Sequence, residues 1–318
     1  MHYIIIALVL VLLELVYFKL ANHYNIIDKP NLRSSHTSVT LRGGGIIFPI
    51  AIIIAFFLGY ASWPLTLAVV LVAVVSFIDD IRPLAPLPRF ASHSIAFILV
   101  AYDLNLFAEP LWILPIVFVL LIGWINAFNF MDGINGITVL YALVAIVSFS
   151  FLPLHEASLP LLITMGLSGL VFGLFNVRTK AKAFAGDVGS ISMALFLGYF
   201  MIKTIMVSGQ LGYILFFSVY GIDAIITILV RLRKRENIFE AHRSHLYQYL
   251  ANEWGYSHVL ISVIYAVLQL GINTIVIYLD NQGGLSVFVE LAILSGLTFV
   301  YLGVRSIVIR RIVPRIGN

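Results

Sequence analysis

Repeated apolar runs of about 20 residues constrain this chain more than any motif, because each is long enough to cross a bilayer as an α-helix. A backbone inside a bilayer must satisfy its own hydrogen bonds, which helices and closed barrels achieve. The alternating strand-length segments of a membrane barrel are not found. Hydrophobic residues make up 61% of the 318 residues, against roughly 45–50% in soluble domains. The sequence therefore predicts an all-α, polytopic integral membrane protein.

We expect a single integral membrane domain over residues 1–318 with eleven membrane-spanning helices. The first run lacks the basic start of a cleaved signal peptide, so we expect it to be retained as a span. The predicted spans are 3–21, 44–61, 64–81, 90–107, 111–129, 136–153, 158–175, 188–206, 211–230, 257–279 and 286–304.

The basic residues predict the orientation of these spans. With eleven spans, all but Lys203 of the nineteen Lys and Arg residues fall on one side of the membrane. The positive-inside rule makes that side cytoplasmic, which places the N-terminus outside and the C-terminus inside. The cytoplasmic segments are then 22–43, 82–89, 130–135, 176–187, 231–256 and the tail after 304.

Cysteine and charge counts limit the chemistry. The chain has no cysteine, so disulfides and cysteine-bound zinc are excluded, and a metal would need oxygen or histidine ligands. The net charge of +4 reports membrane orientation, and we expect contacts with membrane lipids and none with nucleic acid.

The stretch 126–137 is the richest in site chemistry. It places Asn126, Asn129 and Asp132 between two apolar runs, with glycines at 133 and 136. Amides and carboxylates supply oxygen ligands, and glycine allows close approach to a ligand. A plain polar turn between two membrane helices is the alternative.

Two further cytoplasmic segments carry candidate groups near the N-terminal half. Segment 28–36 contains Arg33 and His36, and Arg42 precedes the run Gly43–Gly45, whose amides could hold phosphate. A simple helix-start turn is the alternative for these glycines. Asp79 and Asp80 end the third span as adjacent acids, which either share a cation or are solvated at the headgroups.

The segment 176–190 ends in Gly-Asp-Val-Gly-Ser before an apolar span. Ser190 or Asp187 could cap that helix, and the helix N-terminus would also favour an anion. Asp187 could carry a hard cation between protein and phosphate.

The C-terminal half adds one intramembrane acid and one polar loop. Asp223 is a site candidate by its position within a span, or it satisfies a neighbouring helix. His242 and His245 could share a helix face in the loop that follows, although zinc lacks a third ligand there.

Candidate groups thus gather on five of the six cytoplasmic segments and are almost missing outside. A transporter would concentrate polar groups near the bilayer midplane, often in repeated halves. The asymmetry favours an enzyme that works at the cytoplasmic membrane surface over the alternative, a lipid or polyol-phosphate transporter.

The motifs together resemble the polyprenyl-phosphate N-acetylhexosamine-1-phosphate transferases, the glycosyltransferase family 4 enzymes. The resemblance spans most of the chain and lies nearest to initiators of O-antigen and capsule synthesis. It rests on Asp-x-Pro-Asn-x-Arg-Ser-Ser-His at 28–36, Gly-Gly at 44–45, Phe-Ile-Asp-Asp-x-Arg at 77–82, Asn-x-Phe-Asn-x-x-Asp-Gly at 126–133, Gly-Asp-x-Gly-Ser at 186–190, Asp223, and His-Arg-Ser-His-x-Tyr-Gln at 242–248.

This resemblance implies Mg²⁺-dependent transfer of a sugar phosphate from a UDP-N-acetylhexosamine to undecaprenyl phosphate at the bacterial inner membrane, with release of UMP. Three positions depart from the family pattern. Asn135 replaces a frequent second aspartate, Leu41 replaces a proline, and the last loop lacks paired histidines in favour of Tyr247-Gln248. The sequence leaves open whether the chain is a monomer or a homodimer.

We assign roles on this basis as expectations. Asp187 is the expected principal Mg²⁺ ligand, with Asp132 and Asn129 near the pyrophosphate. We expect Asp79 to orient or deprotonate the acceptor phosphate, or to form an aspartyl intermediate. Asp80 is expected to support the metal site or the fold. The remaining expected substrate-binding residues are Arg33, His36, Asn126, His242, Arg243, His245, Tyr247 and Gln248. The neutral Tyr247 and Gln248 predict UDP-GlcNAc or a UDP-6-deoxy-HexNAc as donor, and not UDP-MurNAc-pentapeptide.

Overall fold

The computed structural model describes residues 2–30, 35, 38–237 and 243–316, the last five by backbone alone. The elements follow one another as α1 (His2–His23), β1 (Ile27–Asp28), β2 (Thr40–Leu41), η1 (Gly44–Ile46), α2 (Ile47–Phe57), α3 (Trp63–Ile81), α4 (Pro86–Asp103), η2 (Leu106–Ala108), α5 (Ile113–Met131), α6 (Ile137–Ser150), η3 (Pro153–Ser158), α7 (Leu159–Asn176), α8 (Gly186–Ser208), η4 (Leu211–Phe217), α9 (Ser218–Arg233), α10 (Leu246–Gln248), the π-helical η5 (Tyr249–Glu253), α11 (His258–Asn281) and α12 (Val287–Ile316).

The all-α prediction is confirmed among the described residues, apart from one antiparallel ladder that pairs Ile27 with Leu41 and Asp28 with Thr40. A helical segment occupies each predicted span. Eight of them are long and apolar enough to cross a membrane: 2–23, 63–81, 113–131, 153–176, 186–208, 211–233, 258–281 and 287–311. The segments 44–57 and 137–150 are apolar but shorter, so the count of eleven spans and their orientation stay predictions.

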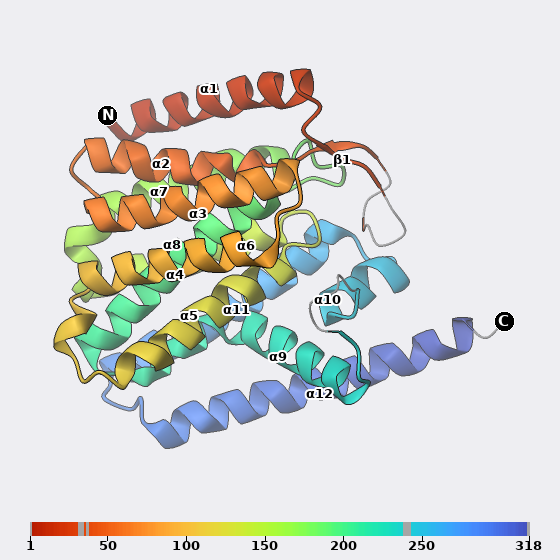
Figure 1. Cartoon of the computed structure of the whole chain (residues 1–318). Helices are drawn as coiled ribbons and strands as arrows, with labels where there is room; N and C mark the ends of the chain where they lie inside the picture. The colour runs from red at the N-terminus through yellow and green to blue at the C-terminus, as the bar shows by residue number, and fades with distance from the viewer. Residues whose placement is uncertain (1, 31–34, 36–37, 238–242, 317–318) are drawn as a thin grey trace.

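The long helices lie side by side, with α1 at one edge and α12 at the other (Figure 1). Strand β1 and the short helix α10 lie at the same end of this bundle, although more than 200 residues separate them in the sequence. Connections between antiparallel helices must return to the bundle ends. The polar segments that the sequence singles out therefore gather at one end.

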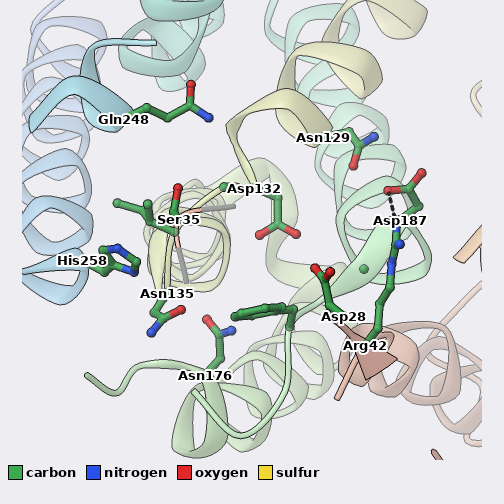
Figure 2. Close-up of a pocket in the computed structure, with 14 residues that line it drawn as sticks. Asp28, Ser35, Arg42, Asn129, Asp132, Asn135, Asn176, Asp187, Gln248 and His258 are labelled. Carbon is green, nitrogen blue, oxygen red and sulfur yellow. Dashed lines mark ion pairs between the residues drawn. The ribbon is translucent and has the colours of Figure 1, made fainter. Parts of the chain in front are cut away.

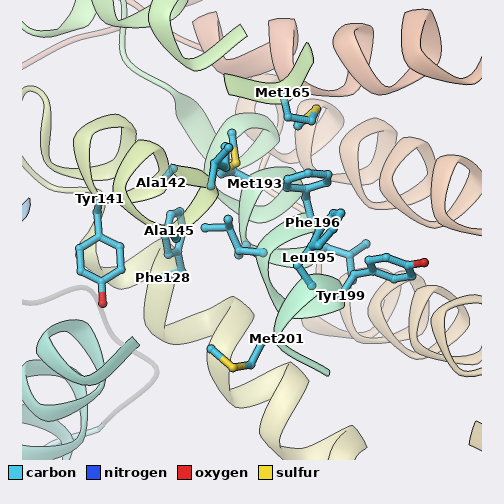
Figure 3. Close-up of a cluster of buried hydrophobic side chains, with 14 of the residues drawn as sticks. Phe128, Tyr141, Ala142, Ala145, Met165, Met193, Leu195, Phe196, Tyr199 and Met201 are labelled. Atoms are coloured by element: carbon cyan, nitrogen blue, oxygen red, sulfur yellow. The ribbon is translucent and has the colours of Figure 1, made fainter. Parts of the chain in front are cut away.

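Helix α8 forms the centre of the bundle and packs against α3 and α5. Nearly every residue from Val188 to Met201 is buried. Figure 3 shows its side chains Met193, Leu195 and Phe196 among those of the neighbouring helices. A membrane helix that is apolar on all sides is expected in the middle of a bundle, where no face meets lipid or water.

Small residues allow the first turn of α8 to lie directly against η1. A Cβ added at Gly189 would lie 2.6 Å from Gly45 Cα, which no real Cβ tolerates. Close backbone approach through small residues is the common way to pack membrane helices. These glycines therefore fix how near the 186–190 motif comes to the 42–45 turn.

Candidate active site

A cavity of about 370 Å³ opens at the end of the bundle where the polar segments meet (Figure 2). Its walls come from five segments far apart in the sequence, which the fold brings together. The lining residues are Asp28, Ser35, Arg42, Asn129, Asp132, Gly133, Ile134, Asn135, Asn176, Phe184, Gly186, Asp187, Gln248 and His258.

Asp132 follows the last residue of α5, and its carboxylate points into the cavity. The hydroxyl of Thr138 donates a hydrogen bond to it. Burial raises the pKa of Asp132 to about 6, the charge of Asp80 adds to the increase, and the Thr138 bond opposes it. A carboxylate that is destabilised in this way gains most from a nearby cation.

Asp187 and Arg42 lie next to each other on the wall of the same cavity, with 4.0 Å between Arg42 Nη2 and Asp187 Oδ1 (Figure 2). Arg42 is held more tightly from behind, because its Nε donates to Asp80 Oδ1 at 2.7 Å. Asp187 therefore keeps its carboxylate available to the cavity while the arginine is fixed by another acid.

Asp80 caps the N-terminus of helix α8, although it belongs to a distant segment of the chain. The backbone N–H groups of Asp187 and Val188 donate to Asp80 Oδ1 and Oδ2, each at 3.0 Å. The expected cap by Ser190 or Asp187 is wrong, since no side chain of the segment caps α8. An acid at a helix N-terminus is favourable, so Asp80 already occupies the anion position expected there.

The amides of Gly44 and Gly45, in the glycine run after Arg42, are already bonded within the protein. Gly44 N donates to Phe184 O at 2.8 Å, and Gly45 N donates to Ala185 O at 3.0 Å. The phosphate interpretation of these two amides is therefore wrong, and the helix-start alternative describes η1. The bonds also join the 42–45 turn to the segment before α8.

Asp79 lies beside the cavity without lining it. Its carboxylate accepts hydrogen bonds from Leu84 N and from Arg89 Nη1, the latter at 3.1 Å. The adjacent acids of the motif thus separate into two roles: Asp80 ties helix α8, whereas Asp79 ties the turn between α3 and α4.

Of the described residues of the C-terminal motif, one contributes its side chain to the cavity. Gln248 lines it, whereas His245 and Tyr247 are buried behind the wall and Arg243 is not part of the lining. The Tyr247 hydroxyl donates to Phe130 O at 3.1 Å. We therefore assign no direct sugar contact to Tyr247.

Two asparagines fasten the loop between α7 and α8. Asn135 Nδ2 donates to Arg178 O at 2.8 Å and to Thr179 O at 3.3 Å. Asn176 accepts from Gly136 N and donates to Ala183 O. Asn135 uses its amide as a donor, which an aspartate at this position could not do.

The other expected site residues divide into two groups. Asn126 is exposed, and its amide donates to Ile122 O on its own helix at 2.8 Å, away from the cavity. Arg33, His36 and His242 lie outside the described residues. Helix α10 begins at Leu246, so His245 precedes the helix that the two histidines were expected to share.

The donor set of the cavity fits a magnesium ion. Among the residues that the structure describes, three carboxylates, Asp28, Asp132 and Asp187, line it with one guanidinium, so these groups would present net negative charge to an anionic diphosphate without an added cation. In the described ranges, no three acidic or histidine side chains cluster tightly enough to hold a metal alone. Mg²⁺ commonly takes one or two carboxylates and completes its ligands with water and substrate phosphates.

Several lining residues were missed by sequence reasoning. Asp28 and Ser35 belong to a motif that was singled out, and Asn176 begins another. His258 gave no signal, because a lone histidine after the helix-capping Ser257 is ordinary.

Comparison with known proteins finds a family profile that matches part of the chain. Residues 62–205 match the profile described as glycosyl transferase family 4. A probable undecaprenyl-phosphate N-acetylglucosaminyl 1-phosphate transferase of Bacillus subtilis is 24% identical over 278 residues, covering 76% of this chain and 74% of the relative. An undecaprenyl-phosphate alpha-N-acetylglucosaminyl 1-phosphate transferase of Thermotoga maritima is 25% identical over 256 residues, covering 78% and 81%.

A second kind of relative matches over a shorter length. The phospho-N-acetylmuramoyl-pentapeptide-transferase of Lactococcus lactis subsp. cremoris is 31% identical over 111 residues. That alignment covers 34% of this chain and 33% of the relative, so the match spans about a third of each protein.

Proposed function

From the match of residues 62–205 to the glycosyl transferase family 4 profile, we propose that this multi-pass membrane protein transfers N-acetylhexosamine 1-phosphate from a UDP-sugar to undecaprenyl phosphate. The single observation that carries the proposal is the convergence of Asp132, Asp187, Asn129 and Arg42 on one cavity at the polar end of the bundle. The two relatives that align over three quarters of the chain are named for this reaction with N-acetylglucosamine.

The chemistry needs charge neutralisation more than a strong base. A phosphomonoester has its second pKa near 6, so the acceptor is largely dianionic at pH 7 and already nucleophilic. It must approach a diphosphate that is also anionic. Mg²⁺ bound through Asp187 and Asp132 would neutralise that charge at the reacting phosphates.

In the proposed step an acceptor phosphate oxygen attacks the sugar-bearing phosphorus of the donor. The bond from that phosphorus to the bridging oxygen breaks, and UMP leaves with the electron pair. Arg42, fixed by Asp80, holds donor phosphate from one wall, and the Asn129 amide faces it from above. Gln248 contacts the donor sugar from the opposite wall.

Asp79 distinguishes two versions of the reaction. An aspartyl intermediate would require its carboxylate to reach the donor phosphorus, whereas the described carboxylate is engaged by Arg89 and Leu84 N outside the cavity. This geometry supports direct attack. In that version the Asp79 and Arg89 pair orients the acceptor phosphate.

We further propose that the cavity faces the cytoplasm and that the product initiates a cell-surface glycan. The basic residues around the cavity end support this orientation. We propose UDP-GlcNAc or a UDP-6-deoxy-HexNAc as the donor, because the neutral amide of Gln248 lines the cavity and two relatives that align over three quarters of the chain are named for N-acetylglucosamine.

Purified protein in detergent, supplied with undecaprenyl phosphate and each of a panel of UDP-sugars, tests the proposal through UMP release. We expect release with a UDP-HexNAc that needs both the acceptor and Mg²⁺. A transporter of the same lipids would release no UMP, and that outcome would refute the enzyme. One equivalent of UMP released without acceptor would instead favour the aspartyl route.

A further inference from the structure

The buried acid on α9 is the meeting point of three distant segments. Asp223 is fully buried, and it does not line the cavity. Its carboxylate accepts hydrogen bonds from the segment before α10, from α11 and from α12. The donors on these segments are His245 Nδ1 at 3.2 Å, Leu246 N at 3.2 Å, Tyr265 Oη at 2.7 Å and Tyr301 Oη at 2.9 Å. Thr227 Oγ1, on α9 itself, donates a fifth bond at 3.3 Å.

The segment 245–248 that Asp223 holds is itself folded against the cavity wall. Gln248 Oε1 accepts from His245 N at 3.2 Å, and the ring of His245 stacks on that of Tyr247 with centroids 5.6 Å apart. Two of the segment's hydrogen bonds go to Asp223, so its position depends on that carboxylate.

Tyr247 connects this segment to the loop that carries Asp132. Its hydroxyl donates to Phe130 O at 3.1 Å. A Cβ at Gly133 would collide with the same hydroxyl and would lie 3.2 Å from Gln248 Nε2. Only glycine fits at position 133, because the Tyr247 hydroxyl fills the space that a side chain would need. The two segments therefore pack closely.

We propose that Asp223 is a positioning residue of the active site: it fixes the segment 245–248 so that Tyr247 supports the Asp132 loop and Gln248 lines the cavity. This inference rests on the proposed function only for the test that uses enzyme kinetics. A buried carboxylate is costly unless it is hydrogen-bonded, and here its oxygens accept from five surrounding groups. Asp223 thus has a supporting role distinct from metal binding or proton transfer.

Asp223→Asn is the informative variant, because it keeps the size of the side chain but turns an NH₂ toward groups that donate. Hydrogen bonds to a charged group contribute about 1.5–3 kcal/mol, so we expect kcat/KM for the UDP-sugar to fall about 10- to 100-fold. The matched control is Asp103→Asn at the other end of the bundle, where the carboxylate accepts from Ser62 Oγ and Tyr199 Oη. Equal losses in both variants would mean general damage to the fold and would overturn the proposal.

A second measurement does not depend on catalysis. The chain has no cysteine, so Gln248→Cys can be labelled uniquely with a soluble maleimide. Gln248 is only 8% exposed. We expect its labelling rate to rise at least about tenfold when Asp223→Asn is added, because loss of the segment's hydrogen bonds increases its opening.

Labelling of Glu109→Cys, an exposed position near the opposite end, should not change. An unchanged rate at position 248 would overturn the inference even in a protein that released no UMP, so the two proposals fail separately. If Asp223→Asn does not fold, the double variant Tyr265→Phe and Tyr301→Phe removes two donors and keeps the charge. It should still accelerate labelling at position 248, and no acceleration would likewise overturn the proposal.

Discussion

The two ends of the bundle each carry a cavity with an aspartate on its wall, and the two cavities differ in the polar groups that line them. The cavity at the far end has a volume of about 540 Å³ and is lined by Ser62, Trp63, Pro64, Tyr102, Asp103, Asn105 and Phe107. Its one acid, Asp103, accepts from two hydroxyls of its own bundle. The cavity at the polar end has about 370 Å³, with three acids and an arginine on its walls.

The difference shows that the lining groups mark the site. Trp63 and Tyr102 are exposed beside Asp103, as expected for aromatic residues at a membrane interface. At the polar end, by contrast, Asp80 and Asp223 satisfy the surrounding structure and leave Asp132 and Asp187 for the cavity. The polar end is therefore distinguished by buried acids that hold the structure around the acids lining the cavity.

The sharpest test of the comparison is sidedness, where we expect an all-or-none result. Gln282 and Lys234 are exposed between consecutive long helices, and the basic residues place them on opposite faces of the membrane. In intact cells an impermeant thiol reagent should label Gln282→Cys and should label Lys234→Cys only after lysis. The reverse pattern would show that the cavity faces outward.

Removing the reactive acids should give the next largest effect. Asp187→Asn and Asp132→Asn should each lower kcat by at least about 100-fold, because a lost group that stabilises transition-state charge costs this much. The Mg²⁺ concentration for half-maximal rate should rise in both. Asp103→Asn serves as the control and should retain near-normal turnover. If Asp187→Asn worked normally at ordinary Mg²⁺, the metal site would lie elsewhere.

Asn135→Asp should have a smaller effect and should lower both activity and stability. The new carboxylate would face the carbonyl oxygens of Arg178 and Thr179 and lose two donated hydrogen bonds. Leaving such groups unpaired costs about 1–3 kcal/mol, so we expect about tenfold lower kcat/KM and a lower melting temperature. Asn105→Asp at the far end is the control. Higher activity or tighter Mg²⁺ binding in Asn135→Asp would indicate a metal ligand at this position instead.

Sequence reasoning predicts the helices well, because an apolar run inside a bilayer must form its backbone hydrogen bonds within itself, whatever it packs against. It also singled out the segments that supply most of the cavity wall. It could not separate Asp79 from Asp80, since adjacent acids differ only in which distant groups they meet. Asp80 meets the start of α8, whereas Asp79 meets Arg89.

The same limit explains the error at Gly44 and Gly45 and the buried position of Tyr247, which the sequence did not predict. A Gly-Gly pair fits a phosphate loop and a helix crossing equally well, and only the partner backbone at Phe184 and Ala185 decides between them. Tyr247 has a phenol suited to a sugar, but its neighbour in space is the Phe130 carbonyl, 117 residues away in the chain. Long-range contacts of this kind leave no local pattern.

The smallest predicted effect separates Gln248 from Tyr247. Tyr247→Phe removes one hydrogen bond behind the wall, worth about 0.5–1.5 kcal/mol, so kcat/KM should fall about two- to tenfold by the same factor for every UDP-sugar. Gln248→Leu removes a polar group that faces the cavity and should change the ranking of UDP-GlcNAc against a UDP-6-deoxy-HexNAc, because only contacts to sugar hydroxyls discriminate between donors that share UDP. Parallel kcat/KM measurements on both donors check this. A changed ranking in Tyr247→Phe with none in Gln248→Leu would mean that the two side chains exchange places when donor binds.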